Sequence, residues 1–229
     1  MNDRRVSSIR NRDFPLPWQT AVMILPPEFY RDDTVTLARK LLGTCLVHRT
    51  RQGRIAGRIV ETEAYLRDDP ACHAARGKTE RNAAMFGPPG AAYVYLIYGM
   101  YHCFNVVTAP AGVGEAVLIR ALEPLEGIEL MQRRRGTENL HELCNGPGKL
   151  CDALDLTPKM NGVKLTRGAL TLTDLPDKPG PDEIVATPRI GISVAVDLPL
   201  RFYIKGNHFA SRRCIFLASR KVPRLRAKK

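Results

Sequence analysis

The sequence places two carboxylates and an aromatic ring at alternate positions of one predicted strand. Residues 57–65 run G-R-I-V-E-T-E-A-Y, so Glu61, Glu63 and Tyr65 share one face if the segment is extended. Acidic residues are unusual in a strand that is otherwise apolar. One interpretation is a general base beside a ring-shaped substrate. The other is a pair of carboxylates on a solvent-exposed face, bound to arginines of the same strand. The segment alone favours neither.

Two further positions could take part in chemistry. His73 lies in a long loop shortly after Asp68 and Asp69, and these three could hold a metal ion. Metal-ligand spacing recurs nowhere else in the chain, so we expect no metal site. A lone histidine in such a loop is also compatible with a structural hydrogen bond. Arg120 lies inside the apolar strand 116–121, so it must reach the surface or pair with a buried anion.

A tyrosine-rich segment predicts a β-hairpin. Residues 93–105 run Y-V-Y-L-I-Y-G-M-Y-H-C-F-N, and Tyr93 and Tyr95 share one face of the first strand. Tyr98 and Gly99 offer a turn, because glycine adopts positive φ without steric cost. A hairpin of the core would explain most of these rings by burial. An aromatic ring at the exposed tip is harder to explain in that way.

The remaining pattern predicts a single α+β domain. Strands and helices are mixed without regular β-α-β alternation, which favours a largely antiparallel sheet with surrounding helices. The irregular segment 66–92 is long for a compact domain, and such loops are usually functional. We expect a basic arm at 1–24, the domain at 25–218 and a basic tail at 219–229. Within the domain, the pattern predicts strands at 44–48, 54–65, 101–107, 116–121, 163–174, 184–194 and 200–205. It predicts helices at 32–40, 124–135 and 145–154, and either Asp32 or Asp33 would cap the first of them.

Composition limits the class of protein. Hydrophobic residues make up 44% and charged residues 25% of the 229-residue chain, and no apolar run is long enough to span a membrane. The six cysteines form no C-x-x-C pair, so we expect reduced core thiols and a cytosolic protein. The net charge of +12 favours an anionic partner such as nucleic acid. The two ends carry most of this charge, and +4 remains for residues 14–219.

Several motifs in one order resemble the alkyladenine (3-methylpurine) DNA glycosylase family. They extend from about Glu28 to Gly206 and cover nearly the whole predicted domain. The resemblance implies the family's single mixed α/β domain, with a curved antiparallel sheet and a protruding hairpin that inserts into DNA. The matching motifs are R-I-V-E-T-E-A-Y, His73, R-N-x-x-M-F-G-x-P-G, Y-V-Y-L-I-Y-G-M-Y-x-C-x-N, V-L-I-R-A-L-E-P-L-E-G, C-x-G-P-x-K-L-C and L-R-F-Y.

The resemblance also implies roles for matched residues in hydrolysis. Glu63 would activate the water that attacks the deoxyribose C1′. The Arg120 side chain and the Ile190 backbone carbonyl would help to hold that water. Because no lysine occupies a matched site position, the expected enzyme is monofunctional: it releases the base and leaves an abasic site. No cofactor and no metal are expected.

Other matched residues would bind the DNA. Tyr65 and Tyr95 would stack on opposite faces of the extruded base, and His73 would complete the pocket. Asn105 would lie near the purine edge and disfavour guanine's exocyclic amine. Tyr98 would fill the gap left by the flipped nucleotide, because an aromatic wedge offsets part of the cost of unstacking. Tyr93 and Tyr101 would be packing residues.

The expected partner is double-stranded DNA that contains damaged purines, bound by a monomeric protein with no membrane association. Expected lesions are of the 3-methyladenine, 7-methylguanine, hypoxanthine and ethenoadenine class. The expected location is the cytoplasm and nucleoid of a bacterium, or the nucleus of a eukaryote. An alternative is a non-catalytic basic nucleic-acid-binding module. A further alternative is a metal-dependent nuclease that uses Asp68, Asp69 and Glu63.

Overall fold

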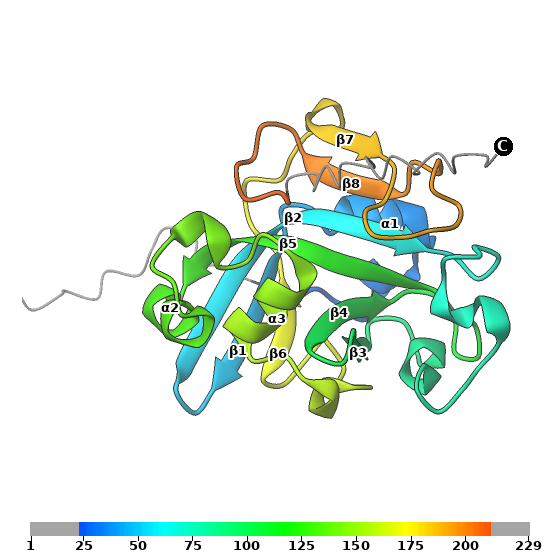
Figure 1. Ribbon diagram of the computed structural model, residues 1–229, viewed down its shortest axis with the longest axis horizontal. Helices are drawn as coiled ribbons and strands as arrows, with labels where there is room; N and C mark the ends of the chain where they lie inside the picture. The colour runs from blue at the N-terminus through cyan, green and yellow to red at the C-terminus, as the bar shows by residue number, and fades with distance from the viewer. Residues whose placement is uncertain (1–22, 212–229) are drawn as a thin grey trace, which may run out of the picture.

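A long strand, β2 (Gly53–Tyr65), is the axis of the sheet. In the computed structural model, which describes residues 23–211, β2 pairs along most of its length with β5 (Ala116–Glu126). On its other edge, its first half pairs with β1 (Cys45–Thr50) and its second half with β8 (Arg201–Ile204). The pairing with β5 shifts register between Ile59 and Thr62, where β2 bends (Figure 1). The irregularity lets one strand serve two successive neighbours.

The described residues form a single α+β domain with an open antiparallel sheet of eight strands, which confirms the predicted fold class. The strand order is β3-β4-β5-β2-β1-β6, and β7 joins through β8. Every pair of strands is antiparallel. The remaining strands are β3 (Ala92–Ile97), β4 (Tyr101–Val107), β6 (Leu170–Thr173) and β7 (Ile184–Thr187).

Three α-helices pack on this sheet. In Figure 1, α3 lies in front of the sheet with α2 beside it, and α1 lies behind β2. Leucines of α1 and α3 join the main core with apolar residues of β1, β2 and β4. The helices are α1 (Thr34–Lys40), α2 (Ile128–Arg135) and α3 (Pro147–Leu154). Short 3₁₀ turns occupy Pro27–Arg31, His73–Arg76, Ala83–Phe86, Leu140–Glu142, Pro158–Met160 and Pro181–Glu183.

The predicted start of α1 is confirmed and that of α2 is wrong. Asp33 caps α1, accepting hydrogen bonds from the backbone of Val35 and Thr36 at 3.0 Å. The helix expected from Pro124 begins instead at Ile128, because residues 124–126 continue β5. β4 pairs only with the first residues of β5, so β2 is the one neighbouring strand at Pro124. Proline is tolerated there, because its missing N–H interrupts no hydrogen bonding to a second neighbouring strand.

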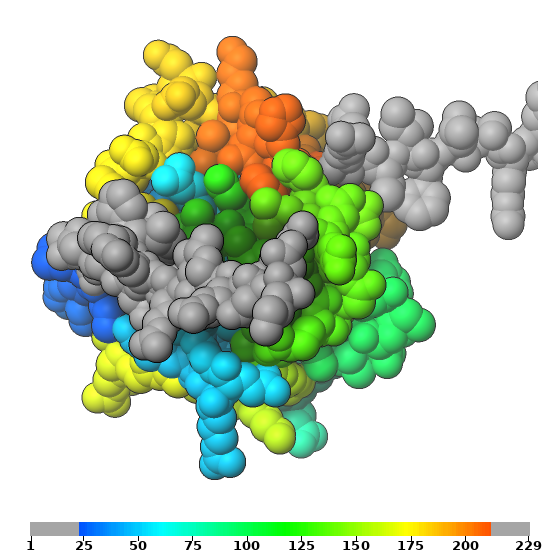
Figure 2. Space-filling model, turned by 90° about the vertical axis from the view of Figure 1, so that its left-hand side faces the viewer, coloured from blue at the N-terminus to red at the C-terminus, as the bar shows by residue number. Residues whose placement is uncertain are grey.

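Several other boundaries differ from the predicted ones. The strands expected at 163–174 and 184–194 are shorter, and residues 188–200 form a loop. Ile24, expected in the arm, bridges to Thr173 beside β6. Residues 1–22 of the arm, residues 212–218 of the predicted domain and the whole tail lie outside the described residues, as does Cys214. The other five cysteines are free and buried. Figure 2 shows the end of the molecule where the β1–β2 turn (cyan) projects.

The long loop after β2 is fixed by buried hydrogen bonds. The side-chain amide of Asn82, itself buried, donates to the carbonyls of His73 at 2.9 Å and Gly77 at 3.0 Å. The loop packs closely against Gly114, just before β5. No helix of residues 23–211 has the length and apolar character needed to cross a membrane.

The close approach at Gly114 yields a stability prediction. A Cβ there would lie 2.4 Å from the Cβ of Ala74 and 2.8 Å from Cζ of Phe86, so both turns of the loop would have to shift. We expect Gly114→Ala to lower the free energy of unfolding by about 1–3 kcal/mol in urea denaturation. Gly180→Ala is the control, because its nearest neighbour would be 3.6 Å away and its φ of −68° suits alanine. Equal stability of the two variants would contradict the packing argument.

Candidate active site

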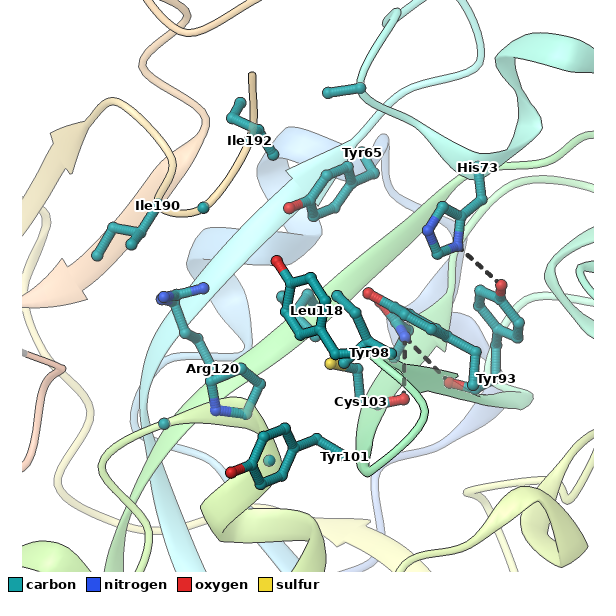
Figure 3. Close-up of a pocket in the computed structure, with 18 of the residues that line it drawn as sticks. Tyr65, His73, Tyr93, Tyr98, Tyr101, Cys103, Leu118, Arg120, Ile190 and Ile192 are labelled. Atoms are coloured by element: carbon teal, nitrogen blue, oxygen red, sulfur yellow. Dashed lines mark hydrogen bonds between the residues drawn. The ribbon is translucent and has the colours of Figure 1, made fainter. Parts of the chain in front are cut away.

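A cavity of about 660 Å³ opens between the hairpin, the sheet and two loops. This volume is typical of sites for small molecules. β2 contributes Tyr65, β5 contributes Leu118 and Arg120, and the loop after β7 contributes residues 190–194 (Figure 3). The hairpin, the loop around His73 and the N-terminus of α3 complete the wall.

The structure brings all eight predicted site residues together. Seven of them line the cavity: Tyr65, His73, Tyr95, Tyr98, Asn105, Arg120 and Ile190. The eighth, Glu63, is fully buried behind the wall and bonds to three of the residues that form it. The carboxylate therefore lies directly behind the cavity wall, in contact with residues that line it.

Three donors hold the Glu63 carboxylate. Oε1 accepts the backbone N–H of Ile190 at 2.9 Å and lies 3.4 Å from a terminal nitrogen of Arg120. Oε2 accepts the hydroxyl of Tyr65 at 2.9 Å. Burial raises the pKa of Glu63 above its ordinary value, and Arg120 and these hydrogen bonds oppose the shift. The N–H of Ile190 is a contact that the sequence did not predict.

Arg120 pairs with buried anions, one of the two outcomes expected for it. Its Nε lies 3.4 Å from Glu61 and its NH1 3.4 Å from Glu63. Both carboxylates are fully buried, so the interpretation of a solvent-exposed face is wrong. Thr62 between them points the other way and donates to the carbonyl of Ala38 in α1 at 2.8 Å. The alternation of β2 therefore places both acids on the cavity side of the sheet.

A second buried ion pair supports Tyr65. The Arg189 guanidinium lies 4.7 Å from the centroid of the Tyr65 ring and forms a bidentate pair with Asp69. Both side chains of this pair are almost completely buried. Asp69 therefore pairs with an arginine, and Asp68 is exposed. Residues 23–211 contain no group of three His, Cys, Asp or Glu side chains that could hold a metal ion.

His73 is positioned by two tyrosines of the hairpin. Its Nδ1 lies 2.9 Å from the hydroxyl of Tyr93, and its ring meets Tyr95 edge-to-face with centroids 4.4 Å apart. Burial, together with the charge of Arg81, lowers the pKa of His73 and favours the neutral imidazole. Tyr93 was expected only to pack. It is buried as expected, but its hydroxyl also binds His73 (Figure 3).

The other residues of the hairpin fill different positions around the cavity. The Asn105 side-chain amide donates to the carbonyl of Tyr93 at 3.1 Å, across the hairpin. Tyr98 lies at the turn with φ of 53°, beside Gly99 at 70°, and is 77% exposed, as the predicted tip requires. Tyr101, expected to be a packing residue, is 45% exposed. It lies at the open end of β4, where Gly148 of α3 leaves room for its ring.

Several residues of the site were not predicted from the sequence. Arg189, which lies over the Tyr65 ring, and Ser193 belong to a loop without a periodic signal, and Cys103 and Leu118 resemble ordinary core residues. Arg201 was detectable in principle, because it is a second arginine inside an apolar strand, like Arg120. Lys149 also lines the cavity, and its Nζ donates to Oδ1 of Asn145 at 2.9 Å.

Comparison with known proteins identifies the family. The family model described as Methylpurine-DNA glycosylase matches residues 28–208. A protein of Methanoculleus marisnigri is 56% identical over 193 residues, which cover 83% of this chain and all of the relative. Proteins of Carboxydothermus hydrogenoformans (49% over 191 residues, 83% and 100% covered) and Francisella tularensis (50% over 182 residues, 79% and 94% covered) are also similar. All three are named "Putative 3-methyladenine DNA glycosylase".

The fold, the cavity and these matches define a DNA glycosylase, a hydrolase that acts on N-glycosyl bonds in DNA. The chain belongs to the methylpurine-DNA glycosylase family.

The buried pair of Asp69 and Arg189 yields a second stability prediction. Asp69→Asn removes the charge that compensates Arg189, and we expect the free energy of unfolding to fall by about 3–5 kcal/mol. Lys178→Met breaks a half-exposed pair with Asp174 and should cost at most about 1 kcal/mol. Urea titration of both variants tests the difference. Similar losses for the two would show that burial does not strengthen the Asp69 contact.

Proposed function

We propose that the protein extrudes alkylated or deaminated purines from duplex DNA and hydrolyses their N-glycosidic bonds. The class includes 3-methyladenine, 7-methylguanine, hypoxanthine and ethenoadenine. A water activated by Glu63 attacks C1′ as the bond from C1′ to the base breaks, which leaves an abasic site. A purine alkylated at N3 or N7 departs as a neutral base, and hypoxanthine or ethenoadenine departs with a proton taken from solvent. The observation that carries the proposal is the buried Glu63, held by Arg120 and Ile190 behind an aromatic cavity.

Extrusion follows from the depth of the site. Glu63 is fully buried, so C1′ of a nucleotide stacked within a duplex cannot come near it. The nucleotide must leave the stack, which costs a few kcal/mol and least for a damaged base. Tyr65 and Tyr95 then stack on the two faces of the base. Purines alkylated at N3 or N7 carry a positive charge in the nucleotide, so rings on both faces favour them through cation–π attraction.

The hydrolytic step needs an ionised carboxylate and one positioned water. Glu63 takes the proton from the water and stabilises the oxocarbenium-like transition state. Arg120 and the Ile190 carbonyl hold the water. Because burial raises the pKa of Glu63, its carboxyl group ionises at a higher pH than that of an ordinary glutamate. The rate therefore falls as the pH is lowered through this raised pKa.

The other residues of the cavity select and retain the base. Neutral His73 contacts the base, with its ring fixed by Tyr93 and Tyr95. Asn105 opposes the exocyclic amine of guanine from its fixed position on the hairpin. The proposed enzyme is a monofunctional glycosylase that acts as a monomer. The water, rather than the amine of Lys149, attacks C1′, and that amine is bound to Asn145.

Tyr98 acts as the wedge. Its positive φ is uncommon for a residue other than glycine, and its side chain is largely exposed at the turn. An aromatic ring that enters the duplex occupies the space left by the flipped nucleotide and offsets part of the cost of unstacking. The turn also lines the cavity, so one short segment serves both the duplex and the pocket.

The first functional prediction concerns Glu63 as the general base. Glu63→Gln should release hypoxanthine or 7-methylguanine roughly 10²–10⁴-fold more slowly in single-turnover assays with EDTA, because it cannot accept the proton. Binding to the same lesion duplex, measured by fluorescence anisotropy, should persist. The acidic limb of the pH–rate profile should disappear in this variant. Glu138→Gln, at an exposed position, is the matched control. Normal turnover by Glu63→Gln would refute the assigned role.

The second functional prediction concerns the wedge. Tyr98→Ser should weaken capture of a lesion in duplex DNA by about 10- to 100-fold, the value of about one stacked ring. The loss should be smaller when the lesion lies in a single strand, where no stack has to be opened. Leu140→Ser removes an exposed apolar side chain elsewhere and controls for general surface effects. If Tyr98→Ser and wild type bind the lesion duplex equally, Tyr98 is not a wedge.

A further inference from the structure

Glu61 is surrounded by donors although the proposed reaction does not use it. Its Oε1 accepts Nε of Arg201 at 2.5 Å and the hydroxyl of Ser211 at 2.8 Å. Its Oε2 accepts the backbone N–H of Ser211 at 2.6 Å. The side chain is completely buried. A buried carboxylate with so many partners is fixed in place.

Ser211 binds the acid and both arginines of this cluster. Its hydroxyl accepts Nε of Arg120 at 3.2 Å, and its carbonyl accepts a terminal nitrogen of Arg201 at 3.1 Å. The residue follows the segment that matches the family model, which ends at 208. A residue outside the matched segment therefore contacts a predicted site residue.

Different nitrogens of the Arg120 guanidinium contact the two carboxylates. Its Nε faces Glu61 and Ser211, and its NH1 faces Glu63. With Arg201 beside Glu61, the cluster contains two carboxylates and two guanidiniums, so its charges balance. Removing one member leaves a buried charge without compensation.

We infer that Glu61 and Ser211 form a positioning device that holds the Arg120 guanidinium against Glu63. The inference rests on the proposed function, because it assigns a purpose to the Glu63–Arg120 contact. Glu61 and Ser211 touch neither the base nor the attacking water. They act through Arg120.

The device has a pH signature. The negative charge of Glu61 raises the pKa of Glu63, although less than burial does. Arg120 lowers the same pKa, so a guanidinium that moves away from Glu63 should raise the pKa of Glu63 and move the acidic limb of the rate profile to higher pH. The charged or titratable groups around Glu63 are Glu61 and Tyr65 of β2, Cys103 of β4, Arg120 of β5, Arg201 of β8 and Arg189 of the loop after β7.

The test compares three variants of the full chain. Glu61→Gln removes the charge and keeps the shape, and Ser211→Ala removes only the hydroxyl. Thr187→Val is the control, because Thr187 binds the far side of Arg201 at 3.0 Å and no contact joins it to Arg120. Thermal unfolding first shows which variants fold. Single-turnover release of 7-methylguanine from duplex DNA is then measured across pH, together with affinity for the lesion duplex.

We expect Glu61→Gln and Ser211→Ala to slow release about tenfold or more at the pH plateau, with unchanged affinity, because a displaced Arg120 misplaces the reacting groups. Ser211→Ala should move the acidic limb to higher pH, and Glu61→Gln should move it less, because the lost charge of Glu61 offsets part of the effect of the displaced Arg120. Thr187→Val should keep the wild-type rate and limb. Folded Glu61→Gln and Ser211→Ala proteins with the wild-type rate and limb would overturn the inference. If Glu61→Gln does not fold, wild-type kinetics of Ser211→Ala would overturn it alone.

A second measurement does not depend on activity. The Nε–H proton of Arg120 is buried and hydrogen-bonded, so its NMR signal should exchange slowly with water in the wild type. The signal is assigned by its absence in Arg120→Lys. Slow exchange should be lost in Ser211→Ala and kept in Thr187→Val, and unchanged protection in Ser211→Ala would refute the device. If the wild type released no damaged base, the proposed function would fail while this signal still reported on Arg120.

Discussion

The Arg120 guanidinium lies between two fully buried carboxylates, and the geometry of the site depends on this contact. Buried charges are costly unless every member has a partner. Here the partners come from three adjacent strands: Glu61 and Glu63 from β2, Arg120 from β5 and Arg201 from β8. A slip of one residue between any two of these strands would send a charged side chain to the opposite face. The ionic cluster therefore constrains the register of the sheet as well as the site.

The parts of the cavity that lie on strands are built differently from those that lie in loops. Tyr65 and Leu118 lie in the paired part of the two central strands, and Arg120 lies at the register shift between Ile119 and Ala121, where buried carboxylates hold its side chain. His73 and residues 190–194 lie in loops whose positions depend on particular side chains. Asn82 holds the carbonyl of His73, and Glu63 binds the N–H of Ile190. Glu63, the proposed general base, thus also anchors the loop of residues 190–194 in the cavity wall.

Local patterns in the sequence predicted the elements and residues that depend on local rules. The alternation in β2, the Asp33 cap and the turn at Tyr98 all follow from neighbouring residues, and the structure has each of them. Contacts between distant segments were not predictable in this way. The pairing of Asp69 with Arg189 spans 120 residues, and that of Glu61 with Ser211 spans 150. The continuation of β5 past Pro124 was not predictable locally either, because proline is tolerated there only where β5 lacks a second neighbouring strand. The number of neighbouring strands is a property of the whole sheet. The eight site residues were predicted together from the family resemblance rather than from periodicity.

The division between a strand-borne ionic cluster and loop-borne walls has an evolutionary consequence. Substitutions in the loop around His73 or in residues 190–194 can reshape the cavity while Glu61, Glu63, Arg120 and Arg201 keep their pairing. Substitutions within the cluster disturb folding and chemistry together, because the same charges serve both. With the proposed roles, lesion preference can therefore diverge among descendants of such a protein while the groups proposed to break the N-glycosidic bond keep their positions.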